Sequence, residues 1–256
     1  MADLSSDAEI DFARVELSYE GFRNLARNPH LSVHGRIGFP DSYRESHEAN
    51  IFADIRAKLA ALDGRRKRVL DIGPGCANLP RMLMQLCQAQ DHRLTLLDSP
   101  EMLAQLPDAE HVTKHKGAFP AAMETAELVG AQFDAILCYS VLHYMFLETN
   151  LFSVVDATAL ALAPGGTALF GDIPNLSKRR RFFAGEAGCR YHKAFTGEDA
   201  PPKLPLFEDA TGRIDDGVLL AMIQRAHQAG CDAYLVPQAD HLPMANRRDD
   251  LIIRKP

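Results

Sequence analysis

The chain has 256 residues, of which 46% are hydrophobic and 24% charged, and its formal net charge at pH 7 is −6. This composition is ordinary for a globular protein with a sizeable core, built as one large domain or as one domain with an appended lid. The negative charge excludes an overall attraction to nucleic acid or anionic membranes, and no apolar run is long enough for a membrane-spanning helix.

The first seven residues are polar and do not resemble a signal peptide. Five scattered cysteines form no C-x-x-C motif and no paired zinc spacing. We therefore expect a cytoplasmic protein with reduced thiols and no metal site.

Residues 1–65 precede the first clear strand and are predicted to form an N-terminal helical cap. Residues 8–26 and, more clearly, 48–62 have the apolar spacing of amphipathic helices. Residues 28–44 between them contain too much glycine and proline for a long regular element. They form either a connecting loop or part of a cap that closes over a ligand, in which His30 and His34 would contribute side chains.

The sequence from Arg68 to Ile72 predicts a buried parallel strand, followed by the turn Gly73-Pro74-Gly75 and a helix from Cys76 to about Gln90. Glycines in such a turn let the backbone approach a ligand closely, and the helix N-terminus favours an anion. The pattern indicates a nucleotide-type site at the carboxyl edge of a sheet. Asn78 replaces the third glycine of a dinucleotide fingerprint, and the Gly-Lys-Ser/Thr ending of a P-loop is absent.

A second predicted strand, Arg93–Leu97, ends at Asp98. A carboxylate at this position can accept hydrogen bonds from both hydroxyls of a ribose, and it can also cap a helix over residues 100–106. A third, more polar strand, His111–Lys116, leads into Gly117-Ala118-Phe119.

The fourth predicted strand, Phe133–Tyr139, continues into Ser140-Val141-Leu142-His143. Helices follow to residue 163, and Pro164-Gly165-Gly166 reads as a helix stop and turn before a fifth strand, Thr167–Phe170. The fifth strand leads to Asp172.

The alternation then fails over about residues 174–212, which contain the basic run Lys178–Arg181, several aromatic residues and the helix-interrupting prolines Pro201, Pro202 and Pro205. This segment is either a solvated basic surface or a lid whose arginines pair with a phosphate or carboxylate of a ligand. Residues 214–230 predict a last crossover helix, and residues 232–236 and 250–254 two strands that pair antiparallel.

The predicted fold is therefore α/β: a doubly wound, mostly parallel seven-stranded sheet with one antiparallel edge strand. The predicted domains are the cap at 1–65 and a main domain at 66–256 with the lid insertion at about 174–212.

Over residues 67–172 these motifs resemble, in order, those of the class I (Rossmann-like) S-adenosylmethionine-dependent methyltransferases. They are the strand with Asp before Gly-x-Gly, the acidic end of the second strand, the aromatic-Asp strand followed by Val-Leu-His, and Leu-x-Pro-Gly-Gly at residues 162–166. The resemblance implies S-adenosylmethionine as cofactor. The implied cofactor-binding residues are Asp71, Gly73, Pro74, Gly75, Asp98, Ser99, Gly117, Ala118, Phe119, Tyr139 and Ser140. The chain departs from the family at Ala118, where an acidic side chain often meets the adenine amino group.

The resemblance also implies methyl transfer to a small molecule, and a looser similarity to enzymes of polysaccharide and natural-product biosynthesis points to an oxygen of a sugar or secondary metabolite. His143 is either a general base or a histidine packed against the sheet, and Asp172 is the second candidate for the catalytic role. The candidate acceptor-binding residues are His34, Arg36, Tyr43, Arg181 and His192.

Two other functions stay open at this stage. One is a cofactor-binding protein without methyl transfer, either a cyclase or a silent binding subunit. The other is a nicotinamide oxidoreductase, which Asn78 disfavours. No nucleic-acid or membrane partner is expected, and a homodimer is left open.

Overall fold

The computed structural model describes residues 18–39, 41–44, 46–204 and 211–256, without the side chains of residues 42 and 43. The strands are β1 (Arg68–Ile72), β2 (Arg93–Asp98), β3 (Val112–Lys116), β4 (Phe133–Tyr139), β5 (Leu162–Pro174), β6 (Asp232–Pro237) and β7 (Arg248–Arg254). The helices are α1 (Tyr19–Arg27), α2 (Val33–Arg36), α3 (Asp41–Arg44), α4 (Glu48–Lys58), α5 (Asn78–Ala89), α6 (Pro100–Leu103), α7 (Leu142–Glu148), α8 (Leu151–Ala161), α9 (Leu176–Ala184), α10 (Glu186–Thr196) and α11 (Asp216–Gln228). Short 3₁₀ turns are η2 (Ala60–Asp63), η3 (Ala121–Glu124) and η4 (Ala245–Arg247).

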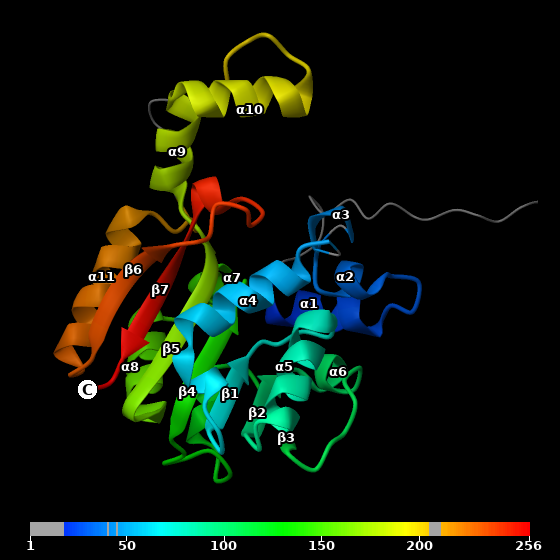
Figure 1. The fold of residues 1–256 in the computed structure, drawn as a ribbon, viewed down its shortest axis with the longest axis vertical. Coiled ribbons are helices and arrows are strands. Elements are labelled where there is room, and N and C mark those ends of the chain that lie inside the picture. Colours follow the sequence, from blue (N-terminus) through cyan, green and yellow to red (C-terminus); the bar gives the residue numbers. More distant parts are fainter. Residues whose placement is uncertain (1–17, 40, 45, 205–210) are drawn as a thin grey trace, which may run out of the picture.

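The strands form one seven-stranded sheet in the order β3-β2-β1-β4-β5-β7-β6 (Figure 1). Pairs among β1 to β5 are parallel, whereas β7 runs antiparallel to both β5 and β6. The predicted doubly wound α/β fold is confirmed. The reversed strand is β7, which lies between β5 and the edge strand β6.

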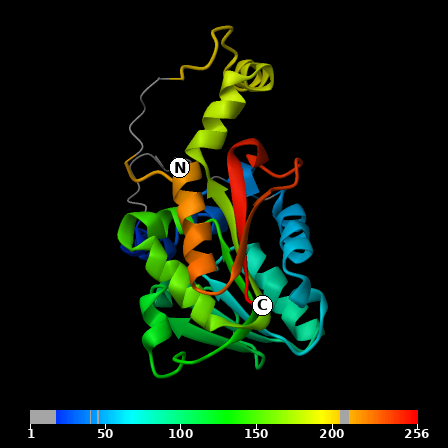
Figure 2. The ribbon, with the colours of Figure 1, turned by 90° about the vertical axis from the view of Figure 1, so that its left-hand side faces the viewer.

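Helices cover both faces of the sheet, with α4 and α5 on one face and α8 and α11 on the other (Figure 2). Because side chains alternate along a strand, consecutive residues face opposite cores. Leu70 and Ile136 pack toward α8 and α11, while Val69 and Leu137 pack toward α4 and α5. Strands buried on both faces explain the almost continuous apolar runs of β1 and β4 in the sequence.

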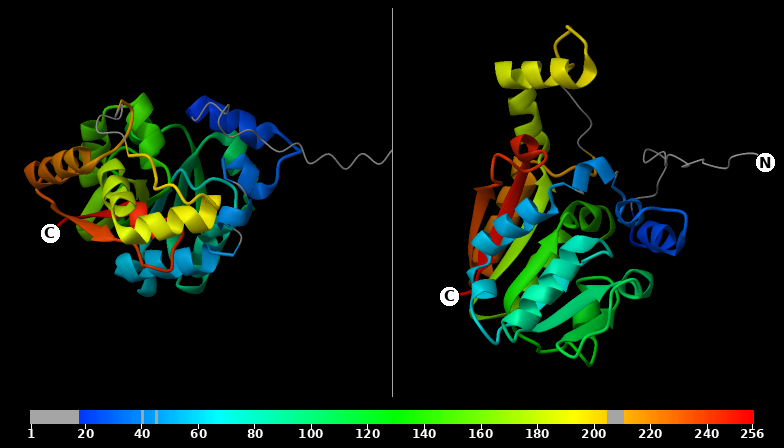
Figure 3. Two further views of the ribbon diagram at one scale, coloured as in Figure 1. Left: turned by 90° about the horizontal axis from the view of Figure 1, so that it is seen from above. Right: turned by 45° about the vertical axis from the view of Figure 1, so that its right-hand side comes forward.

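Two additions stand at the carboxyl ends of the parallel strands. The cap helices α1, α2 and α3 lie beside the ends of β1 and β2, and α9 and α10, which we call the arm, project from the end of β5 (Figures 1 and 3). The predicted cap and insertion both therefore lie at the edge of the sheet where a ligand is expected. Helix α4, which was predicted as part of the cap, packs Ile51 and Ile55 into the core under the sheet.

The structure differs from the predicted elements in two places. Pro164-Gly165-Gly166, predicted as a turn, lies inside β5, where Gly165 has φ +76° and donates from its backbone N to Lys255 O at 2.9 Å. The strand pairing shifts register here, so the glycines form a bulge that continues the sheet. The segment 174–212, read as irregular, forms two helices in its described part, because residues 176–196 contain no proline: Pro174 precedes α9, and Pro201 and Pro202 follow α10.

Candidate cofactor and acceptor site

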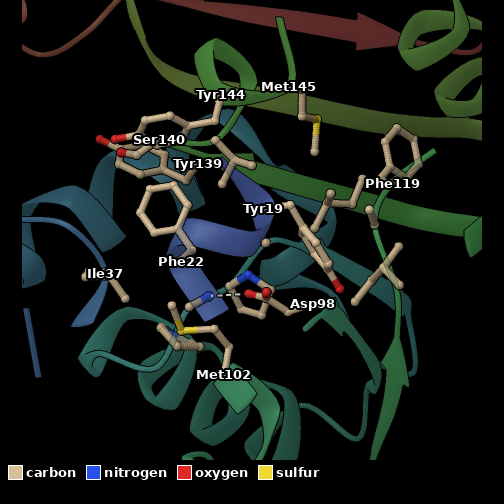
Figure 4. A pocket seen from close by; sticks show the side chains of 18 of the residues that line it. Tyr19, Phe22, Ile37, Asp98, Met102, Phe119, Tyr139, Ser140, Tyr144 and Met145 are labelled. Atoms are coloured by element: carbon tan, nitrogen blue, oxygen red, sulfur yellow. Dashed lines mark hydrogen bonds between the residues drawn. The ribbon is translucent and has the colours of Figure 1, made fainter. Parts of the chain in front are cut away.

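A cavity of about 340 Å³ opens at the carboxyl ends of β1, β2 and β4. Its walls are the turn after β1, the ends of β2 and β4, the turn after β3, helix α7 and the cap. Figure 4 shows Asp98 and Met102 toward one end, Tyr139, Ser140 and Tyr144 toward the other, and Tyr19 and Phe22 projecting from α1. The volume falls within the range of small-molecule sites, roughly 300–1,000 Å³.

The turn after β1 has the backbone conformation that its glycines permit. Gly73 and Gly75 have φ of +65° and +67°, a region that residues with a Cβ rarely adopt. A Cβ on Gly73 would lie 2.8 Å from Val141 Cγ2, and one on Gly75 would lie 2.8 Å from Ile37 Cγ2. The glycines are thus required by backbone conformation and by close packing of the cap and of α7 over the turn.

The carboxylate of Asp98 fixes this turn to the end of β2. Its Oδ2 accepts a hydrogen bond from Gly75 N at 3.0 Å (Figure 4), and its Oδ1 accepts one from Ser99 N at 2.6 Å. Burial raises the pKa of Asp98 to about 6, partly offset by these hydrogen bonds. Burial, with a smaller contribution from the charge of Asp98, raises the pKa of Asp71 to about 8. At neutral pH, Asp98 is therefore the ionised member of the pair.

The other residues predicted for the cofactor fall into two groups. Pro74, Gly117, Ala118, Phe119, Tyr139 and Ser140 line the cavity together with Gly73, Gly75 and Asp98. Asp71 is buried under the turn, and Ser99 caps α6 through Met102 N at 3.3 Å; neither lines the cavity.

The N-terminus of α5, predicted to attract an anion, is already occupied by a side chain of the protein. Glu48 of α4 accepts hydrogen bonds from Asn78 N at 3.3 Å and from Asn78 Nδ2 at 2.8 Å. Ala77 at the N-cap position offers no side-chain acceptor, so the carboxylate of Glu48 replaces the missing cap.

A buried polar cluster lies where β4 and β5 end. Ser140 (φ +62°) and Asp172 (φ +59°) share a hydrogen bond, and Arg44 of the cap donates to Ser140 Oγ at 2.5 Å. Arg44 and Arg248 lie 3.4 and 3.2 Å from Asp172 Oδ2. Asp172, proposed as catalytic, does not line the main cavity; it lines a neighbouring cavity of about 20 Å³ that shares Phe39, Arg44 and Tyr139 with the main one.

His143, the first candidate for a general base, lies beside the main cavity without lining it. Burial, together with the charge of Arg248 and opposed by Asp172, lowers the pKa of His143 to about 3. Its buried Nδ1 has no hydrogen-bond partner among the described residues. The imidazole is neutral at physiological pH, but its low pKa makes it a weak proton acceptor.

None of the predicted acceptor-binding residues with a described side chain lines the main cavity. His34 lies between Asp41 at 2.8 Å and Glu48 at 3.3 Å, and Arg36 donates to Gln105 Oε1 at 2.9 Å. These bonds hold the cap together and fix it to the domain.

Two more of these residues lie on the arm, where Arg181 pairs with Asp216 and His192 lies 3.9 Å from Glu198. The side chain of Tyr43 lies outside the described residues. The acceptor roles therefore stay predictions, and for Arg181 and His192 they require the arm to move.

The structure adds lining residues that sequence reasoning missed. They come from the cap and from α7, and they are Tyr19, Phe22, Ile37, Phe39, Arg44, Glu48, Tyr144, Met145, Glu148 and Thr149. The rings of Phe22 and Tyr144 meet edge to face with their centroids 4.7 Å apart. The signal for them in the sequence was that Ile37, Phe39 and Arg44 belong to the segment 28–44, which was expected to cover a ligand.

The described part of the chain holds no group of three or more His, Cys, Asp or Glu side chains suited to a metal ion. Two histidine pairs do have i, i+4 spacing, His30 with His34 and His111 with His115, but neither belongs to such a group. Within the same residues, no helix has both the length and the hydrophobicity to cross a bilayer.

Comparison with known proteins places the fold among methyltransferases. Residues 70–170 match a family model described as a methyltransferase domain. The structure is similar to an N-methyltransferase, NodS from Bradyrhizobium japonicum WM9, solved with S-adenosyl-L-homocysteine (16% identity, TM-score 0.57, covering 94% of this chain and 100% of that one). It is also similar to an O-methyltransferase family protein from Burkholderia thailandensis (14% identity, TM-score 0.54, covering 93% of this chain).

The chain spans only 63% of the length of the Burkholderia protein. No curated protein sequence matches the chain significantly. The methyltransferase-domain match and the shared fold confirm the predicted resemblance to the class I S-adenosylmethionine-dependent methyltransferases.

Proposed function

We propose that this methyltransferase-domain protein transfers a methyl group from S-adenosylmethionine to an oxygen atom of a small molecule. The observation that carries the proposal is the Asp98 carboxylate, which holds the Gly73-Pro74-Gly75 turn through Gly75 N and lies at one end of a cavity at the carboxyl edge of the sheet. The S-adenosylhomocysteine complex of the Bradyrhizobium protein, which shares the fold, supports the choice of cofactor.

The residues present fit this cofactor along the whole length of the cavity. Asp98 has lone pairs left to accept hydrogen bonds from two ribose hydroxyls, and the ring of Phe119 lies at the adenine side. The backbone of Gly73 and Gly75 allows close approach of the methionine part. With Ala118 in place of an acidic residue, adenine selectivity would come from backbone groups and from the face of Phe119.

When bound, the cofactor supplies a methyl group that its sulfonium has already activated. The protein then has to hold the acceptor's nucleophile in line with that methyl, and such positioning contributes about 7–11 kcal/mol in well-oriented reactions. Tyr19 and Phe22 from α1, with Tyr144 and Met145 from α7, cover the cavity and exclude water.

A small acceptor is favoured because the cavity, which both the cap and α7 line, has a volume of only about 340 Å³, and because the net charge of −6 disfavours nucleic acid. Oxygen is favoured by the looser sequence similarity to polysaccharide and natural-product enzymes. An oxygen nucleophile needs its proton removed, and Asp172 and the neutral His143, neither of which lines the main cavity, stay the predicted candidates for this role.

The test is calorimetric binding of S-adenosylhomocysteine, followed by incubation with methyl-labelled S-adenosylmethionine and pooled small-molecule extracts. We expect binding in the micromolar range or tighter, and a labelled product whose fragmentation places the methyl on oxygen. Binding without any labelled product would favour a silent binding protein, a methyl on nitrogen would overturn the oxygen assignment, and binding of a nicotinamide cofactor instead would overturn the proposal.

A further inference from the structure

We propose that Arg44 is the carboxylate-binding residue of the cavity, at the end opposite Asp98. This inference rests on the proposed function and extends it, because it assigns an acidic group to one of the two ligands. That carboxylate belongs either to the methionine part of the cofactor or to the acceptor.

Arg44 is a buried cation with unused donors. Its side chain is 8% exposed, lines both cavities, and places its guanidinium carbon 4.3 Å from the ring centroid of Phe39 and 5.7 Å from that of Tyr139. Its Nη2 donates to Ser140 and Asp172. Within the described residues, its Nε and Nη1 have no hydrogen-bond partner and are not fully buried, so both can donate to a ligand in the cavity.

Arg44 shares its acidic partner with a second arginine. Asp172 faces two guanidinium groups, those of Arg44 and Arg248. The next two carboxylates along β7 are already paired, Asp249 with Lys178 and Asp250 with Lys58, each at 2.7 Å, and Lys58 pairs with Asp54 as well. These charges balance as a group, but Arg44 has only a share of one carboxylate, and a ligand carboxylate would complete its pairing.

Other parts of the cavity offer a carboxylate no comparable place. The N-terminus of α5 is taken by Glu48, which is itself held by His34 and Asn78. The ribose end carries the negative charge of Asp98. A carboxylate that enters the cavity therefore finds its favourable partner at Arg44, whose planar guanidinium is suited to such a group.

The position of Arg44 limits the source of the carboxylate to two. Its contacts at the ends of β4 and β5 place it two strands or more from Asp98 at the end of β2, in a sheet whose strands lie about 4.8 Å apart. The methionine carboxylate of a nucleoside held at Asp98 can extend in this direction. An acidic group on an acceptor that enters beside Tyr144 would reach the same guanidinium.

The experiment compares three probes on the parent protein and on Arg44→Gln. The probes are S-adenosylhomocysteine, 5′-methylthioadenosine, which lacks the amino acid part, and benzoate added to protein saturated with S-adenosylhomocysteine. Arg56→Gln, an exposed arginine of α4 paired with Asp63, is the matched control and should bind all probes as the parent does.

If the cofactor supplies the carboxylate, Arg44→Gln weakens S-adenosylhomocysteine binding by about tenfold or more and leaves 5′-methylthioadenosine unchanged. If the acceptor supplies it, both nucleosides bind as before and benzoate binding is lost. Arg44→Lys keeps the charge without the planar group, so its affinities for the probes should lie between those of the parent and of Arg44→Gln. Arg44→Lys also replaces Arg44→Gln in the comparison if Arg44→Gln does not fold.

Two results would overturn the proposal. If Arg44→Gln binds both nucleosides more weakly by the same factor, Arg44 has a structural role. If Arg44→Gln binds S-adenosylhomocysteine as the parent does, and benzoate binding is unchanged or is absent from both proteins, Arg44 binds neither ligand. A parent protein that binds neither nucleoside would instead contradict the proposed function, and benzoate titration of parent and variant without nucleoside would still decide the role of Arg44.

Discussion

Asp98 connects a strand, the glycine turn and the cavity. It ends β2, its carboxylate holds the backbone of the glycine turn at Gly75, and it faces the cavity. Because burial raises its pKa to about 6, it is ionised at pH 7.5 and protonated at pH 5. Its ability to accept two ribose hydrogen bonds should therefore be lost as the pH falls through 6.

Asp98→Asn tests this role with little change in shape. Hydrogen bonds to a charged group contribute about 1.5–3 kcal/mol, so we expect S-adenosylhomocysteine affinity at pH 7.5 to fall by about tenfold or more. The parent should bind more weakly at pH 5 than at pH 7.5, and the variant should lose this dependence. Calorimetry at both pH values measures it, with the melting temperature of the free protein as control; a variant with parental affinity would contradict the assignment.

His143 shows how an environment changes the role of a residue. The sequence places a histidine after the fourth strand, where a base would be useful, but burial and the charge of Arg248 lower its pKa to about 3. A histidine with this pKa stays neutral between pH 5 and pH 9, so its own ionisation lies outside the working range.

We therefore expect His143→Gln to leave the shape of the pH–rate profile between pH 5 and pH 8 unchanged, whatever its effect on the maximum rate. The profile is measured with the acceptor identified by labelling. An acidic limb near pH 6–7 that is present in the parent and disappears in the variant would instead assign the base to His143.

At the scale of elements, the turn between β1 and α5 connects the cap to the domain. Ile37 of the cap packs on Gly75, and Val141 before α7 packs on Gly73. We therefore expect the glycine turn to affect ligand binding through the position of the cap as well as through its own backbone.

Gly75→Ala separates these contributions when it is compared with Gly130→Ala. Both glycines have positive φ, +67° and +74°, so each substitution should cost stability of about 1 kcal/mol. Only the Cβ at position 75 meets another residue, whereas none lies within 4 Å of a Cβ at position 130.

Chemical denaturation and S-adenosylhomocysteine titration of the two variants distinguish the effects. We expect both to lose stability and only Gly75→Ala to lose affinity. Equal affinity in the two variants would show that the packing of Ile37 over the turn does not contribute to the site.

In the whole molecule, the arm projects beyond the carboxyl ends of the parallel strands (Figure 3), and none of residues 176–196 lines the cavity. It is held at its base by Arg247 of η4, which lies 5.9 Å from the ring centroid of Phe183 and 5.3 Å from that of Tyr191. An arm with few contacts to the domain can close over a bound acceptor, as lids in many enzymes do.

We expect amide hydrogen exchange in residues 176–196 and 28–39 to slow when S-adenosylhomocysteine and acceptor are bound together. S-adenosylhomocysteine alone should slow exchange mainly in the cap, which already lines the cavity. The strands β1 and β4 serve as internal reference. Unchanged exchange in the arm with both ligands bound would remove Arg181 and His192 from the acceptor site.

The sheet, the order of its central elements and the residues that line the Asp98 end of the cavity could be predicted from the sequence alone. These follow from local signals: apolar runs of strand length, glycines where φ is positive, and an acidic residue at the tip of β2. Asp98 and Gly73-Pro74-Gly75 are close in space because parallel neighbouring strands end at the same edge, so their proximity needs no knowledge of side-chain packing.

The other end of the cavity, around Arg44, could be recognised only in the tertiary structure. Arg44, Ser140, Asp172 and Arg248 come from four segments separated by 32 to 96 residues between consecutive members, and no pattern in the chain links them. The low pKa of His143, the occupation of the α5 N-terminus by Glu48 and the distance of the arm from the cavity depend in the same way on burial and on neighbours in space. Burial and long-range electrostatics arise from the packed structure as a whole, and local sequence does not encode them.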